Sequence, residues 1–153
     1  MIQRIQSVYL FIITILMILP LCTPIAQLIV PAGGIFEFYS YGVIQIEGQP
    51  PLKVYYWTLL SINIIAIPIP FITIFLYKRR RWQVRLCLIE IILCLFFFAL
   101  MWYDLNRFAN DAEISIMYKI GFILPVISAI LGYLALRGVL KDIQLIRSYD
   151  RIR

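Results

Sequence analysis

The sequence predicts an all-α membrane protein, a bundle of four transmembrane helices with a short β-hairpin in its first outer loop. Of the 153 residues, 63% are hydrophobic and 14% are charged. The mean hydropathy is +0.91, outside the usual range of soluble globular domains. The apolar residues gather in four blocks, each near the roughly 20 residues that a helix needs to cross a bilayer. We therefore expect residues 1–153 to form one transmembrane domain.

The four expected spans cover residues 8–30, 54–77, 84–103 and 114–136. Prolines interrupt three of them, which spanning helices tolerate when neighbouring helices satisfy the freed backbone groups. The first block is longer than the apolar core of a signal peptide and three more follow, so we expect it to be retained. After the fourth block, apolar residues continue at helical spacing within a basic tail, residues 137–153.

Basic residues predict the orientation, because Lys and Arg concentrate in cytoplasmic loops. Eleven of the 14 lie near the two termini, between the second and third blocks, or at the start of the third. Both termini are therefore expected in the cytoplasm, and the net charge of +6 needs no nucleic-acid partner. We expect this basic rim to contact lipid headgroups or a protein partner. Its members are Arg4, Lys78, Arg79, Arg80, Arg81, Arg85, Lys141, Arg147, Arg151 and Arg153.

The first outer loop carries the alternating pattern of a β-hairpin over residues 34–47, with a turn near Tyr41-Gly42. A two-stranded hairpin alone is marginal in water, so it needs support from the helix ends or from a partner. Its expected contact residues are aromatic: Phe36, Phe38, Tyr39 and Tyr41.

Three polar residues inside the spans are candidate functional groups: Glu90, Asn63 and Thr14. An intramembrane carboxylate usually faces a bundle interior and marks a functional site. The alternative for Glu90 is a structural ion pair near the headgroups, with Arg85 or Arg4 as its partner. Asn63 and the hydroxyl residues are expected to hydrogen-bond between helices.

Enzymatic chemistry has little support in the sequence. The chain has three cysteines and no histidine. Cys87 and Cys94, seven residues apart, are about 10 Å apart along a helix, too far for a disulfide. No metal, cofactor, catalytic motif or phosphate-binding glycine loop is expected.

The opening Met-Ile-Gln-Arg-Ile-Gln-Ser-Val-Tyr-Leu and the closing Ile-Arg-Ser-Tyr-Asp-Arg-Ile-Arg resemble the terminal signatures of an uncharacterised family of small four-helix membrane proteins from Bacteroidota. The resemblance implies a bacterial inner membrane, with the outer loops in the periplasm, and it implies no activity.

The functional expectation is a non-enzymatic accessory or scaffold subunit of a larger inner-membrane complex. It rests on the lack of catalytic groups, the structured outer loop and the basic tail. A small oligomeric transporter or proton-coupled carrier using Glu90 is the alternative, and lipid binding is a further one. Membrane lipids and either a protein partner or further copies of the chain are the expected partners.

Overall fold

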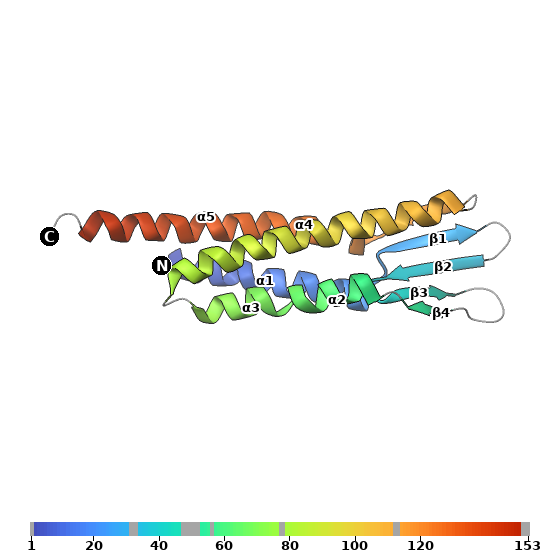
Figure 1. Ribbon diagram of the computed structural model, residues 1–153, viewed down its shortest axis with the longest axis horizontal. Helices are drawn as coiled ribbons and strands as arrows, with labels where there is room; N and C mark the ends of the chain where they lie inside the picture. Colours follow the sequence, from blue (N-terminus) through green and yellow to red (C-terminus); the bar gives the residue numbers. More distant parts are fainter. Residues whose placement is uncertain are drawn as a thin grey trace.

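The computed structural model describes residues 2–30, 34–46, 53–55, 57–76, 79–111 and 114–150. The helices form an elongated bundle and the strands form a sheet at one end of it, here called the sheet end (Figure 1). α1 begins and α5 ends at the opposite end, here called the terminal end (Figure 1). The elements are α1 (Ile2–Cys22), β1 (Ala26–Val30), β2 (Gly34–Tyr39), β3 (Gly42–Gln45), β4 (Lys53–Tyr55), α2 (Trp57–Ala66), α3 (Pro68–Phe75), α4 (Arg80–Asp111), β5 (Ser115–Tyr118), the 3-10 helix η2 (Ile120–Phe122) and α5 (Leu124–Asp150).

Four helical segments of the described chain are long and apolar enough to cross a membrane. They cover Ile5–Cys22, Trp57–Phe75, Arg80–Arg107 and Ile120–Leu145. The prediction of four apolar helices is thus confirmed. α2 and α3 together form one of these segments, with a break at Ile67. Pro68 and Pro70 cause this break because they have no N–H for the carbonyls of Ile64 and Ala66 one turn earlier.

The predicted end of the first span, at Val30, was wrong. α1 ends at Cys22, and Ala26–Val30 is the strand β1. Pro24 explains this end, because a proline cannot continue the helix and disfavours helical backbone at the preceding Thr23. The apolar run hid the change of structure, since a short buried strand and a helix segment can be equally hydrophobic.

The other predicted boundaries shift for a related reason. The second span begins at Trp57 rather than 54, because Lys53–Tyr55 is β4. The third helix covers Arg80–Asp111 instead of 84–103, and the fourth begins after β5 rather than at 114. The basic tail continues α5 without interruption to Asp150, as the helical spacing predicted.

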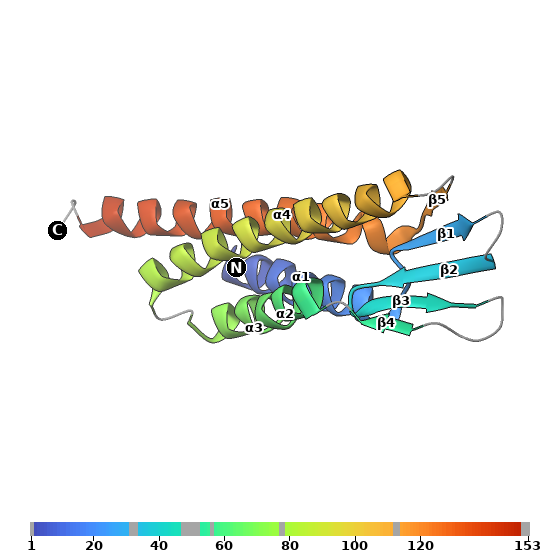
Figure 2. The ribbon, with the colours of Figure 1, turned by 45° about the vertical axis from the view of Figure 1, so that its right-hand side comes forward.

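The predicted hairpin is confirmed as β2 and β3, which pair in antiparallel fashion from Phe36↔Gln45 to Tyr39↔Gly42. It is only part of a five-stranded antiparallel sheet with the order β4-β3-β2-β1-β5. β5 comes from the loop between α4 and α5 and lies at the edge beside β1 (Figure 2). Support for the hairpin therefore comes mainly from strands that sequence patterning assigned to helices.

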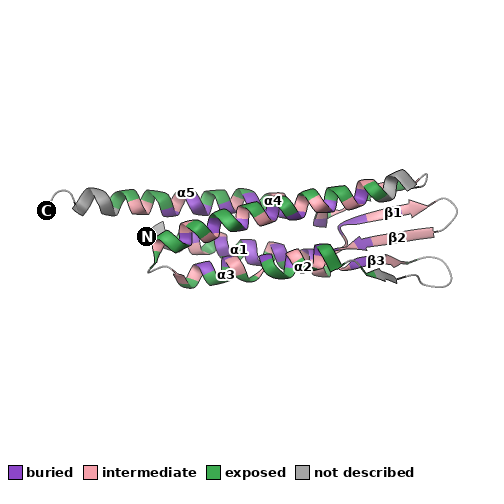
Figure 3. Ribbon diagram, viewed as in Figure 1, coloured by how far each residue is buried: buried purple, intermediate pink, exposed green. Residues whose placement is uncertain are grey.

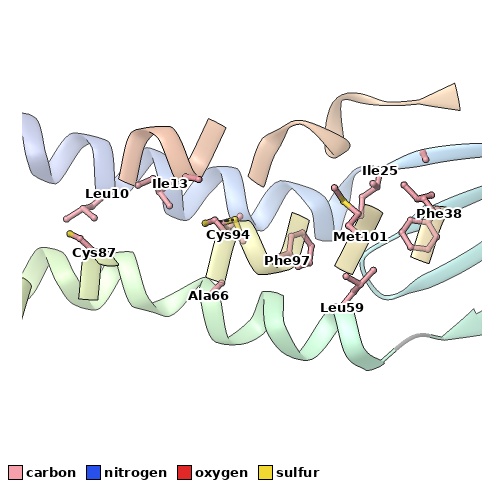
Figure 4. Packing of buried hydrophobic residues seen from close by; sticks show 14 of the residues in the cluster. Leu10, Ile13, Ile25, Phe38, Leu59, Ala66, Cys87, Cys94, Phe97 and Met101 are labelled. Carbon is pink, nitrogen blue, oxygen red and sulfur yellow. Dashed lines mark hydrogen bonds between the residues drawn. The ribbon is translucent and has the colours of Figure 1, made fainter. Parts of the chain in front are cut away.

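Buried residues form one continuous core through the bundle and into the base of the sheet. They line the inner faces of the helices while the outer faces are exposed (Figure 3). Phe38 of β2 is fully buried with Ile25, Leu59 and Met101, and Figure 4 shows these four side chains near one another where the bundle meets the sheet. Apolar helix faces exposed in this way are suited to contact with lipid tails.

A salt bridge ties β2 to the segment after β5. Lys119 Nζ lies 2.6 Å from Glu37 Oε1, and the hydroxyl of Tyr39 donates to Glu37 Oε2 at 2.8 Å. The hydrogen bond from Lys119 is the largest effect on the Glu37 carboxyl and holds its pKa below the ordinary 4.5, although partial burial opposes this. The hydrogen bond to Glu37 and burial raise the pKa of Tyr39 to about 12. The pair spans β1 and thus locks three strands.

Replacing Lys119 by Met should lower the free energy of unfolding by about 1 kcal/mol at pH 7, the upper range for a partly exposed ion pair. Because the folded-state pKa of Glu37 is lowered from 4.5, the pair stabilises the fold above that pH and loses its effect as the pH falls through the folded-state value. Thermal unfolding in detergent should therefore separate wild type from Lys119→Met at pH 7 but not at strongly acidic pH. Lys141→Met, at an exposed position of α5, is the matched control. A gap that persists at low pH would contradict this account.

Candidate functional site: buried polar and sulfur groups in the helix bundle

α4 presents an inward stripe with intervals of three or four residues, the pattern of a helix that packs along one face. Glu90 occupies a position of this stripe, about 15 Å along the helix from its first residue, and is only 1% exposed. A carboxyl group thus takes a place in a stripe whose other buried members are uncharged. The stripe contains Gln83, Cys87, Glu90, Cys94, Phe97, Met101 and Leu105.

Sulfur groups lie next to this carboxyl. Cys94 Sγ is 3.4 Å from Glu90 Oε1 and 3.8 Å from Met17 Sδ on α1. A thiol has one proton, so it can donate to only one of these acceptors at a time. The second oxygen, Glu90 Oε2, is buried and has no hydrogen-bond partner among the described residues.

The interpretation of Glu90 as a shallow ion pair was wrong for the cations that the structure describes. The Arg85 side chain is exposed and its guanidinium lies over the Trp82 ring, 5.2 Å from the centroid. Gln6, two residues after Arg4 on α1, donates to Asp142 and not to Glu90. Arg4 lies in α1, but its side chain is outside the described residues. Glu90 is buried because it lies on the inward stripe. The number of residues between Glu90 and the nearest Arg does not predict which face of the helix Glu90 occupies.

Asn63 of α2 is a second buried polar group with 0% exposure, and neither atom of its amide has a partner in the described chain. Ala66, one turn away, lies at the level of Cys94 (Figure 4). Since α2 and α4 run in opposite directions (Figure 1), Asn63 and Glu90 lie on opposite sides of that level. They are about 10 Å apart along the bundle, so they do not form one site.

Thr14 lies near the level of Glu90, because Met17 contacts Cys94 and α1 and α4 run in the same direction (Figure 1). Its hydroxyl donates to the carbonyl of Leu10 in its own helix at 3.0 Å. Ser128 and Thr73 bond their own helices in the same way. The expectation that these hydroxyls link helices was therefore wrong.

The structure brings much of the basic rim together at the terminal end. Arg79 precedes α4, which begins with Arg80 and Arg81. Arg80 Nη1 donates to the backbone carbonyl of Asp142 in α5 at 3.3 Å. Asp142 Oδ2 accepts from Gln6 at 2.9 Å, so α1, α4 and α5 are joined there. Arg85 and Lys141 are exposed. Lys78, Arg151 and Arg153 lie outside the described residues, as does the side chain of Arg147.

A pocket of about 360 Å³ opens beside this rim, lined by Phe75, Leu76, Arg79 and Trp82. A cation flanked by aromatic and aliphatic side chains is typical of residues at a membrane interface. The expected contact between the rim and lipid headgroups is chemically reasonable at this pocket.

The hairpin aromatics divide into two groups. Phe38 is fully buried and Phe36 packs against the core, so these two rest on the helix ends. Tyr39 and Tyr41 stack on each other with ring centroids 5.2 Å apart. Phe36, Tyr39 and Tyr41 are half-buried, so Phe38 is the one predicted contact residue that is fully buried.

Cys94 and Met17 are the site residues that sequence reasoning did not single out. Both resembled packing residues, because small sulfur-containing side chains are common in apolar cores. The available signal was local: Cys94 follows Glu90 by four residues and must share its helix face. The contact of Met17 in α1 with Cys94 depends on how the helices pack, so it could not be predicted from the sequence.

The fold and these buried groups define a small helical membrane protein with an antiparallel sheet at one end. Residues 2–152 match the model of a domain of unknown function, DUF4293, and the chain belongs to this family. The search of curated proteins found no match.

Asn63→Leu should leave the bundle as stable as wild type or more stable by about 1 kcal/mol, because an unpaired amide is replaced by an apolar group of similar volume. Thermal unfolding in detergent measures this. Ser61→Leu, at an exposed position on the same helix, controls for added hydrophobicity. A clear loss of stability in Asn63→Leu alone would show that the amide has a structural partner.

Proposed function

We propose that the protein is a non-enzymatic accessory or scaffold subunit of the bacterial inner membrane, whose sheet binds an extended segment of another protein. The distribution of basic residues favours cytoplasmic termini and a periplasmic sheet. The observation that carries the proposal is the edge of the sheet at β5, which pairs with β1 and with no second strand among the described residues.

β5 is the last strand in the sheet order. Lys119 N–H donates to the Ile25 carbonyl at 3.0 Å, so backbone groups that alternate along an antiparallel strand point away from β1 at Tyr118 and Ile116. Each of these residues offers an N–H and a C=O. A partner strand can pair with such an edge by strand addition.

The two edge strands of the sheet, β4 and β5, differ in features that control pairing with another strand. β4 is three residues long, begins with Lys53 and follows Pro50 and Pro51 in the sequence. Lysine and nearby proline are common means of blocking edge pairing. β5 has the uncharged sequence Ser-Ile-Met-Tyr, and Met117 and Tyr118 are 56% and 50% exposed.

A different protein fits this edge better than a second copy of the chain. Copies in one membrane share one orientation, and the strands run along the length of the molecule (Figure 1). The β5 strands of two copies related by symmetry would therefore run parallel, with Ile116 opposite Ile116. In a parallel ladder, each residue bonds to the residues before and after the one opposite it on the neighbouring strand. Those residues of β5 point toward β1, so the two edges cannot pair in this way.

A photo-crosslinking residue at Met117 should capture one protein partner in native membranes, whereas the same residue at Tyr55 on β4 should not. Ile116→Pro removes an outward donor without removing a bond to β1, so it should reduce the adduct about tenfold, the effect of 1.4 kcal/mol. Thermal stability should be unchanged. Met117→Pro, which breaks a bond to β1, should lower stability and serves as the comparison. Equal adducts from both edges, or adducts only between copies of the chain, would refute the proposal.

The buried Glu90 favours a second candidate, a small proton-coupled carrier working as an oligomer. In proteoliposomes, a pH-sensitive dye should then report proton entry that Glu90→Gln abolishes. Glu37→Gln, in the sheet, is the matched control and should keep wild-type entry. Equal rates for wild type and Glu90→Gln would eliminate the carrier.

A further inference from the structure

We propose that Cys94, Met17 and Glu90 form a binding site for one monovalent copper ion, Cu(I), between α1 and α4. The geometry that carries this inference is the approach of a thiol, a thioether and a carboxyl group inside the bundle. It is independent of the function proposed for the sheet edge.

The two sulfur atoms are at the separation that one metal ion needs. Metal–sulfur distances near 2.3 Å in a trigonal arrangement place two sulfur ligands about 4 Å apart, and Cys94 Sγ lies 3.8 Å from Met17 Sδ. Glu90 Oε1 is 3.4 Å from the same thiol sulfur. The ligands come from two helices that share the buried core, so the bundle holds them in place before an ion arrives.

The donor set selects the metal. Thiolate and thioether are soft ligands, which favour Cu(I) over hard cations such as Mg²⁺ or Ca²⁺. Zinc prefers a set of Cys, His and carboxylate ligands, and no cluster of three His, Cys, Asp or Glu side chains suited to a metal occurs in the described ranges. A thioether as the third ligand is therefore the distinguishing feature.

Charge balance favours a monovalent ion for the same site. When Cu(I) binds, the S–H bond of Cys94 breaks and an S–Cu bond forms, with no change in oxidation state. The thiol proton is released to the solvent, so the step balances. Thiolate and Cu(I) together carry no net charge, whereas a divalent ion would leave an uncompensated positive charge in an apolar interior.

The chain supplies matched controls for both sulfur ligands. Cys87 is also buried on the inward stripe of α4, but it is about 10 Å from Cys94 along the helix. Met101 is fully buried on the same stripe, seven residues beyond Cys94. Neither side chain can reach an ion bound between Cys94 and Met17, so each tests whether any buried sulfur is sufficient.

Titration of the purified full-length protein with Cu(I) tests the site, in detergent, without oxygen and against a competing Cu(I) chelator. Wild type should bind one ion per chain, with X-ray absorption showing two sulfur ligands at about 2.3 Å. Loss of a group that only supports a metal ligand costs about 10- to 100-fold in affinity. Loss of a ligand should cost at least as much, so we expect about 100-fold weaker binding for Cys94→Ser and at least about tenfold for Met17→Leu. Cys87→Ser and Met101→Leu should bind like wild type.

Glu90→Gln tests whether the carboxyl group belongs to the site. Because Glu90 Oε1 lies 3.4 Å from Cys94 Sγ, this variant should bind Cu(I) more weakly than wild type. Each variant is compared for thermal stability, and Met17→Leu, which preserves side-chain volume, keeps the test valid if Cys94→Ser unfolds. Absence of binding to folded wild type would overturn the proposal. So would equal binding by folded Met17→Leu, or equal loss in Cys87→Ser.

Discussion

The end of α1 at Pro24 is the constraint on which the rest of the structure depends. A proline has no N–H to donate, so the helix must stop and the chain must find other partners for its backbone. Thr23 closes the helix by donating both its N–H and its hydroxyl to the Leu19 carbonyl. Ile25 then donates to Phe38 and accepts from Lys119, so β1 begins already bonded on both sides.

This corner also fixes the approach of the fourth span. Gly121 of η2 packs so closely against it that a Cβ atom there would lie 2.8 Å from the Pro24 carbonyl oxygen. Only glycine allows this approach of two backbones. The chain between β5 and α5 is thereby held against the end of α1, and β5 is placed beside β1. A sheet made from two separate loops thus depends on one proline and one glycine.

Polar groups serve different purposes along the bundle. At the terminal end, Gln6, Arg80 and Asp142 join three helices through hydrogen bonds, and at the sheet end Lys119 and Glu37 join strands. Within each set, the polar groups bond to one another. Between them, Asn63 and Glu90 have buried atoms with no hydrogen-bond partner in the part of the chain that the structure describes. Burial of an unpaired polar group is costly, and such groups concentrate where a protein binds something or moves a proton.

Apolar length and turn-forming residues were sufficient to predict four helices, because a span requires about 20 apolar residues regardless of its neighbours. Alternation was sufficient for the hairpin between Gly34 and Gln45. The strands β1, β4 and β5 were missed because each lies at the edge of an apolar block, where hydropathy is the same for a strand and a helix. Their pairing is decided by long-range hydrogen bonds.

For the candidate site, the sequence by itself determined that a carboxyl group lies inside a span and that Cys94 shares its helix face, because both follow from position along one helix. Only the tertiary structure decided that Met17 completes this group, that Arg85 does not, and that Asn63 lies elsewhere. Those relations depend on how α1, α2 and α4 are rotated and shifted against one another. Packing of side chains over the whole bundle sets that rotation, and no local pattern encodes it.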